Sequence, residues 1–131
     1  QMDQYLADAL KPQGRTTSAD EEPEKGFFYR SDQLNFARLG VPVLYARGGF
    51  DKRDGGAAAG RAAYDDFTAH RYHKPADNYD PNWDLSGVIE DAQALYAVGK
   101  RLADESTFPQ WLPGSQFGAV REASLKATEK H

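Results

Sequence analysis

The clearest periodic pattern in the chain runs from residue 84 to about residue 105. Apolar residues recur there every three or four positions, which is the spacing of one face of an amphipathic helix. They are Leu85, Val88, Ile89, Ala92, Leu95, Tyr96, Gly99 and Leu102. Asp91, Lys100 and Arg101 fall on the polar side. We therefore predict a helix that is capped by Asp84, buries this apolar stripe and exposes its charged side chains.

A shorter pattern around Gly40 predicts a helix followed by a strand. Apolar side chains within residues 34–39 suit a helix that Ser31 or Asp32 caps and that Gly40 ends in the left-handed conformation. The apolar run 41–46 is most simply a buried strand. Helix, glycine turn and strand form half of a βαβ unit, whose parallel strands are usually buried on both faces. This pattern predicts an α/β fold.

The rest of the chain shows little further strand pattern. A short helix over residues 3–11 ends before Pro12 and Gly14, and residues 15–18 could form a second short strand. Two short strands do not make a stable open parallel sheet. We therefore expect further strands to come from a partner copy or from upstream sequence. An opening inside a helix suits a piece of a longer protein, although a natural short N-terminal helix explains it equally well.

The composition narrows the class of protein. The chain has 131 residues, of which 40% are hydrophobic and 27% charged, and this suits a single domain over residues 1–131. Its net charge of -4 argues against a nucleic-acid partner. There is no run of about 18 apolar residues, so we expect no membrane span. The absence of cysteine excludes disulfides, thiolate zinc ligands and a cysteine nucleophile.

Two segments are expected to lie outside the core. Residues 48–63 are rich in glycine, alanine and charged residues, and we interpret them as a surface excursion. Residues 121–131 are polar, and we expect them to fray and to leave the terminal His131 disordered.

Candidate chemistry is concentrated in the loop of residues 72–80. This loop offers His73, with Asp77 four residues later. A neutral imidazole is a good zinc ligand, and a nearby oxygen acceptor fixes its tautomer. Asp77 could accept that hydrogen bond, or it could organise the loop as an Asx turn. One histidine does not hold a catalytic zinc ion, which takes three protein ligands.

Two motifs resemble segments of the zinc-dependent exopeptidases related to bacterial two-zinc aminopeptidases and glutamate carboxypeptidase. Residues 28–33 read Phe-Tyr-Arg-Ser-Asp-Gln, followed by Phe-Ala at 36–37 and Gly-Val-Pro-Val-Leu at 40–44. Residues 72–80 read Tyr-His-Lys-Pro-Ala-Asp-Asn-Tyr-Asp. The motifs follow the order of the family, and the resemblance spans roughly residues 3–105. It implies a partial three-layer fold, in which helices flank a mixed, mostly parallel sheet and this chain is the C-terminal portion.

The resemblance implies a centre with two zinc ions. The family holds them with a histidine, a bridging aspartate, a pair of glutamates, a further aspartate and a final histidine, which His73 matches. The other ligands come from segments upstream of the first motif. Glu21 and Glu22 lie too close to that motif to be the glutamate pair, and Gln33 stands where the family commonly has histidine. We therefore expect an incomplete zinc site and an inactive chain, with His70 not a ligand.

The same resemblance suggests roles for four further residues. Tyr72 would donate a hydrogen bond to the oxyanion of a tetrahedral intermediate, unless it is only a half-buried loop aromatic. Asp32 would lie near the active site, or would serve only as a helix cap. Arg30 could bind a substrate carboxylate or pair with an acid on the surface. Tyr29 belongs to an aromatic patch that forms either core or the wall of a substrate pocket.

We therefore predict that the full-length parent is a zinc metallopeptidase of the aminopeptidase type that acts on peptides. This chain would contribute the last zinc ligand and part of the substrate pocket. The alternatives are a non-catalytic binding or dimerisation module on the same scaffold, as in the receptor-like relatives, and an enzyme resembling glutaminyl cyclase. A truncated sheet exposes its edges, so we expect the chain to self-associate. Relatives of this type are often exported, which suggests a periplasmic or secreted protein.

Overall fold

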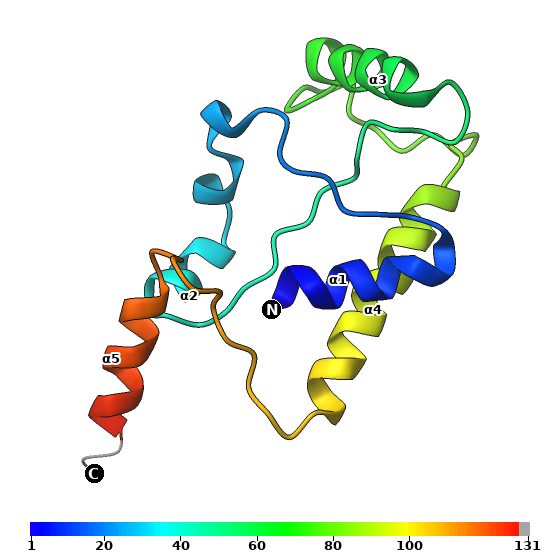
Figure 1. Ribbon diagram of the computed structural model, residues 1–131. Coiled ribbons are helices and arrows are strands. Elements are labelled where there is room, and N and C mark those ends of the chain that lie inside the picture. The colour runs from blue at the N-terminus through cyan, green and yellow to red at the C-terminus, as the bar shows by residue number, and fades with distance from the viewer. Residues whose placement is uncertain (129–131) are drawn as a thin grey trace. The chain divides into compact units, whose positions relative to one another are not determined.

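The computed structural model describes residues 1–128, whose regular structure is helical (Figure 1). The α-helices are α1 (Met2–Leu10), α2 (Gln33–Arg38), α3 (Gly56–His70), α4 (Ser86–Asp104) and α5 (Gly118–Thr128). Short 3-10 helices span Lys11–Gln13, Pro23–Lys25 and Phe27–Arg30. The chain divides into two compact units. The first contains residues 1–46 and the segment from residue 90 onward, and the second contains residues 47–89. None of the described helices is both long and apolar enough to cross a membrane.

The predicted α/β fold is wrong. Residues 1–128 form no strand, and the only β-type backbone pairing among them is an isolated bridge between Lys52 and Gly56. The predicted strands at 15–18 and 41–46 are irregular. A strand persists when a neighbouring strand satisfies its backbone hydrogen bonds, and no such neighbour lies in the described part of the chain. The predicted three-layer arrangement around a mostly parallel sheet is therefore not the one observed.

Gly40 follows α2 in the left-handed conformation that the sequence predicts, and it lets two segments approach closely. Its φ is 82°, and a Cβ atom at this position would lie 2.6 Å from the Cα atom of Arg121 in α5. The indole N–H of Trp111 donates a hydrogen bond to the Gly40 carbonyl at 2.9 Å. The Phe117 ring lies 5.2 Å from the Trp111 ring and 6.0 Å from the Phe28 ring. A side chain at position 40 would collide with the backbone of α5 at Val120 and Arg121.

Helix α4 begins and ends close to the predicted positions. The Asp84 carboxylate accepts a hydrogen bond from the backbone N–H of Ser86 at 2.9 Å, which confirms the predicted cap. This hydrogen bond from the backbone lowers the pKa of Asp84.

The prediction that α4 buries its apolar stripe is wrong. The buried side chains of this helix are Ala94 and Val98, which lie on the opposite side. Large side chains of the predicted stripe are exposed instead. They are Leu85, Val88, Ile89, Leu95 and Tyr96.

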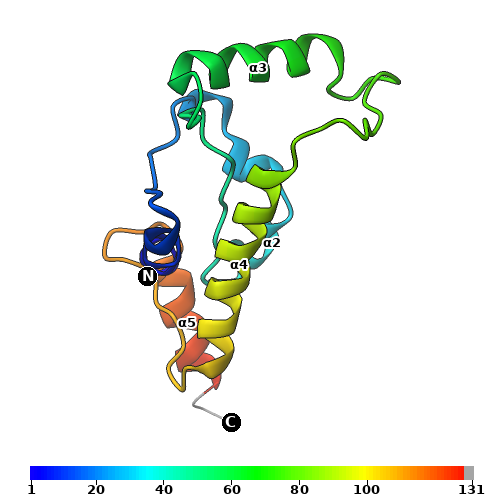
Figure 2. The same ribbon diagram turned by 90° about the vertical axis from the view of Figure 1, so that its right-hand side faces the viewer.

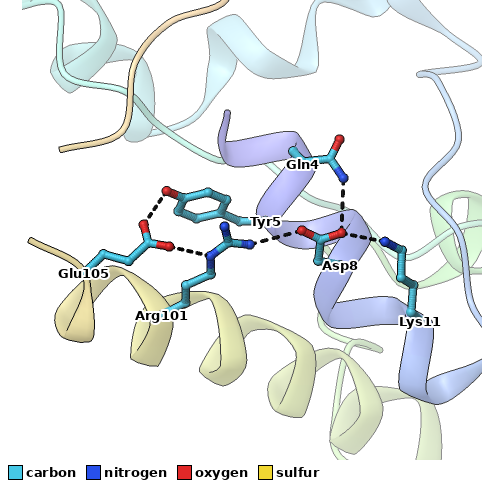
Figure 3. A network of polar contacts seen from close by, with 6 residues as sticks. All are labelled: Gln4, Tyr5, Asp8, Lys11, Arg101 and Glu105. Atoms are coloured by element: carbon cyan, nitrogen blue, oxygen red, sulfur yellow. Dashed lines mark hydrogen bonds and ion pairs between the residues drawn. The ribbon is translucent and has the colours of Figure 1, made fainter. Parts of the chain in front are cut away.

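The buried side of α4 is the side that meets α1, and charged residues make that contact. Figures 1 and 2 show α1 crossing α4, and Figure 3 shows the side chains of the two helices pointing toward each other. The Arg101 guanidinium donates to Asp8 at 3.1 Å and to Glu105 at 2.7 Å. It also lies 3.8 Å from the centroid of the Tyr5 ring, and the Tyr5 hydroxyl donates to Glu105. Arg101, predicted to point into water, is therefore a contact residue.

A second polar contact joins the segment after α1 to the first turns of α4. The Arg15 guanidinium forms an ion pair with Asp91 at 2.6 Å. The side-chain amide of Gln13 donates to the Glu90 carbonyl at 2.9 Å. Asp91 was also predicted to lie on the solvent face, and it too contacts another element.

The second unit is built around α3, which contains half of the predicted surface excursion 48–63. Gly60 is buried, and a Cβ atom there would collide with the Phe50 carbonyl. The Phe50 ring meets the Tyr64 ring edge-on at 5.3 Å, and the Arg61 guanidinium lies 3.8 Å from the Phe50 centroid. This part of the excursion is therefore helical and packed, and the interpretation of the whole segment as a surface excursion stays a prediction.

Helix α5 occupies most of the tail that the sequence predicts to fray. Residues 129–131, with His131, lie outside the described residues. Fraying over 121–131 stays a prediction.

Candidate functional site

The loop that follows α3 starts with a tight turn. The backbone N–H groups of Arg71 and Tyr72 both donate to the Phe67 carbonyl, at 2.8 and 2.9 Å, and so end the helix. His73 has a φ of 55°, in the left-handed region that non-glycine residues occupy uncommonly. The Lys74 N–H then donates to the Arg71 carbonyl at 2.9 Å. The chain therefore reverses direction at the candidate zinc ligand.

Tyr72 and His73 form a stacked pair in this turn. Their ring centroids lie 3.9 Å apart, and the planes differ by 19°. Both side chains are exposed. The stacking restrains the plane of the imidazole, while exposure leaves its nitrogens accessible to a metal ion or a substrate.

Asp77 is exposed, and its backbone N–H donates to the Lys74 carbonyl at 3.0 Å. No hydrogen bond joins its carboxylate to His73 within residues 1–128, so its predicted role beside the imidazole stays a prediction. The acid that organises the loop is Asp80, which sequence reasoning missed. Its carboxylate accepts from the backbone N–H of Asn82 at 2.9 Å and from the Asn82 amide at 3.0 Å. The sequence Asp-Pro-Asn at 80–82 is typical of such a turn and was the available signal.

An aromatic cluster at the far end of the loop was also missed. The rings of Tyr79 and Trp83 meet edge-on at 5.8 Å. The Arg71 guanidinium lies 5.9 Å from the Trp83 centroid and so joins the two ends of loop 71–83. Tyr79 is 70% exposed and Trp83 is 40% exposed. The only sign of this cluster in the sequence was the presence of two aromatic residues four positions apart in a polar segment.

The other three predicted site residues lie in the first unit. Tyr29 and Arg30 belong to the 3-10 helix before α2, and Asp32 occupies the N-cap position of α2. The Tyr29 hydroxyl accepts a hydrogen bond from the side-chain amide of Gln116 at 2.8 Å, and the Arg30 guanidinium lies 5.9 Å from the Phe27 centroid. Asp32 is exposed, and its side chain makes no capping hydrogen bond. Asp32 is therefore the N-cap residue of α2 by position, without a side-chain hydrogen bond to the helix.

The predicted site residues thus form two sets. Tyr72, His73 and Asp77 share one loop of the second unit, and Tyr72 contacts His73 directly. The set of Tyr29, Arg30 and Asp32 belongs to the first unit.

The donor groups do not make up a complete metal centre. Among the residues that the structure describes, no three histidine, aspartate or glutamate side chains are placed to hold one ion. His70 uses its Nδ1 atom in a contact of 2.9 Å with the Asp66 carboxylate. A catalytic zinc ion takes three protein ligands. His73 could supply one of them, and the other described residues do not supply the remaining two.

The first unit also has a concavity of about 340 Å³. It is lined by residues 1–3, by Pro42 and Val43, and by residues 110–115. None of the six predicted site residues lines it, so it does not coincide with the candidate chemistry.

The comparison with protein families identifies the class. A family model described as Peptidase family M28 matches residues 1–97, well over half of the chain. The chain belongs to this family of metallopeptidases, whose members are generally zinc-dependent, and this confirms the predicted relationship. The matched segment contains all six predicted site residues. No curated protein and no solved structure matches the chain.

Proposed function

We propose that this chain supplies part of the active site of a zinc-dependent peptidase of the aminopeptidase type, with His73 as a zinc ligand. Membership of the M28 family supports a peptidase. The observation that carries the proposal is the exposed, stacked Tyr72–His73 pair at the turn after α3. It presents an imidazole and a phenol side by side on an ordered turn.

Each member of the pair has a separate task. An imidazole nitrogen of His73 can donate its lone pair to zinc. The Tyr72 ring lies nearly parallel to the imidazole, so its hydroxyl is held close to any group bound there. A phenolic O–H in that position donates a hydrogen bond to the oxyanion that forms when a peptide carbonyl is attacked.

The set in the first unit, taken by itself, is proposed to bind peptide. Arg30 is an exposed cation that suits a substrate carboxylate, and Tyr29 offers an exposed ring. Asp32 is exposed and its side chain makes no capping hydrogen bond to α2, so its carboxylate can accept hydrogen bonds from a peptide. The remaining zinc ligands and the general base would come from polypeptide beyond the described residues.

Zinc titration followed by NMR tests the ligand. The carbon-bound ring protons of the three histidines report on each imidazole separately, and the variants His73→Asn and His70→Asn assign them. Asparagine tolerates the left-handed conformation, so His73→Asn preserves the turn. We expect zinc to shift the His73 signals and to bind weakly, and we expect His73→Asn to abolish this binding.

His70→Asn is the matched control, because His70 is also exposed but is paired with Asp66. It should leave zinc binding at His73 unchanged. Zinc shifts confined to His70, or zinc binding that survives His73→Asn, would contradict the proposal.

An activity assay of the purified chain tests the proposal that it supplies only part of the active site. A single imidazole without the remaining ligands should give no measurable hydrolysis of an aminoacyl-anilide in the presence of zinc. Measurable hydrolysis, or a tight stoichiometric zinc site by calorimetry, would show that the centre is complete.

A second candidate function is a binding or dimerisation module on the same scaffold. The exposed apolar side of α4 favours it, because an exposed row of large apolar residues is typical of an interaction surface. We propose that this side associates with a second copy of the chain. Multi-angle light scattering should then show a dimer that Ile89→Lys disrupts and that Ala97→Lys, at an exposed position on the other side of the same helix, leaves intact. A monomer at high concentration would rule this candidate out.

A further inference from the structure

Loop 71–83 carries an aromatic cluster that the proposed roles of Tyr72 and His73 do not use. Tyr79 and Trp83 meet edge-on at 5.8 Å, which is a favourable geometry for two aromatic rings. Both side chains are exposed despite their size, Tyr79 at 70% and Trp83 at 40%. The pair therefore does not serve as core of the second unit, whose packing centres on Phe50 and Gly60.

The cluster is ordered by contacts within the loop. The backbone N–H of Trp83 donates to the Asp80 carbonyl at 3.1 Å, and the Asp80 carboxylate holds Asn82. The Arg71 guanidinium lies over the Trp83 ring at 5.9 Å. Such an arrangement presents the rings with little conformational freedom left to lose, which favours ligand binding.

The cluster and the candidate ligand are linked through Arg71. Arg71, which contacts Trp83, is two residues from His73 and accepts the backbone hydrogen bond that closes the turn around it. The candidate ligand and the two aromatic rings therefore belong to the same short loop.

We propose that Tyr79 and Trp83 form a subsite for a large apolar or aromatic side chain of the substrate peptide. This inference rests on the proposed function of His73. Aromatic rings bind such side chains through apolar contact and edge-to-face packing, and they offer little to glycine or to charged side chains. The subsite would thus set the preference of the peptidase for the residue next to the scissile bond.

NMR of the two tryptophan indoles tests the subsite on the chain itself. The dipeptides Gly-Phe and Gly-Gly carry the same charges and differ only in one side chain. Gly-Phe should shift the Trp83 indole signal in a saturable way, and Gly-Gly should bind at least about threefold more weakly. The Trp111 indole, which is hydrogen-bonded to Gly40, should not respond. The variants Trp83→Phe and Trp111→Phe assign the two signals.

Two tyrosines of equal exposure provide matched variants. Tyr79 is 70% exposed and Tyr96, on α4, is 71% exposed. Tyr79→Ala should weaken Gly-Phe binding by about two- to tenfold, and Tyr96→Ala should leave it unchanged. Equal shifts with both dipeptides, an unresponsive Trp83, or equal effects of the two variants would overturn the subsite.

The zinc titration separates failure of the subsite from failure of the proposed function. If zinc binds at His73 but Gly-Phe does not shift Trp83, the subsite is wrong and the ligand assignment stands. If Gly-Phe binds at Trp83 but zinc does not bind at His73, the aromatic pair binds side chains outside a zinc peptidase, and the inference fails as stated.

Discussion

On α4, the apolar side that composition predicts to be buried is exposed, and the side predicted to face water is buried. One side carries Val88, Ile89 and Tyr96 and is exposed. The other carries Ala94 and Val98 between charged residues and is buried against α1. Within this one helix, the side with the smaller apolar side chains is the side that packs against a neighbouring helix.

The difference lies in what α1 offers. Asp8 sits where Arg101 can reach it, and Tyr5 provides a ring beneath the guanidinium and a hydroxyl for Glu105. Small side chains at positions 94 and 98 let the helices approach, and the polar groups around them find partners. Hydrophobic pattern states which side a helix can bury, whereas the chemistry of the neighbouring element decides which side it does bury.

The largest effect is expected from placing a charge on the buried side. Val98 is 4% exposed, so Val98→Asp would remove a carboxylate from water and place it at an apolar position. We expect the free energy of unfolding to fall by about 3–5 kcal/mol, which is enough to undock or unfold α4. Denaturation followed by circular dichroism measures this loss. A stability close to that of the parent chain would show that this side is not buried.

An intermediate effect is expected from titration of the α1–α4 contact. Hydrogen bonds from Lys11, Gln4 and Arg101 lower the pKa of Asp8, and hydrogen bonds from Arg101 and Tyr5 lower the pKa of Glu105. A carboxylate whose pKa is lowered by folding stabilises the fold above its unfolded pKa. That stabilisation is lost as the pH falls through the lowered value. Stability should therefore decline as the pH is reduced below about 4.5, the ordinary pKa of glutamate.

The alkaline side should show the opposite dependence. The hydrogen bond to Glu105 raises the pKa of Tyr5, so its contribution is present below pH 10.0 and is lost as the pH rises through the raised value. The double variant Asp8→Asn/Glu105→Gln should flatten the acid limb of a plot of midpoint temperature against pH. An unchanged acid limb in this variant would mean that other carboxylates cause the decline.

The smallest effect on stability is expected on the exposed side. Tyr96 is 71% exposed, so Tyr96→Asp should change the free energy of unfolding by no more than about 0.5 kcal/mol. The same denaturation experiment measures it beside Val98→Asp. If Tyr96→Asp proves the more damaging of the two, the assignment of the two sides of α4 is reversed.

Local signals in the sequence were sufficient for several elements. Asp84 followed by a periodic apolar pattern located α4 and its cap, and Gly40 marked the turn after α2. These features depend on a few neighbouring residues. The buried side of α4 depends on Asp8 and Tyr5, which lie more than 90 positions away, and no periodicity in α4 encodes them.

The prediction of a sheet was wrong for a related reason. The run 41–46 has the composition of a buried strand, but a strand also needs a second strand beside it, and pairing is not a property of one segment. The motif of residues 72–80 singled out Tyr72 and His73 as candidates, and the structure places their rings in contact. The ring cluster of Tyr79 and Trp83 was not predictable, since it depends on how loop 71–83 folds back on itself.

At His73, the residue that gives the most stable turn differs from the residue that can bind a metal ion. For a residue with a β-carbon the left-handed backbone conformation costs roughly 1–2 kcal/mol, and glycine would avoid that cost. A randomised library screened only for heat resistance should therefore enrich glycine at position 73. A library screened for metal capture should retain the imidazole and accept a lower melting temperature.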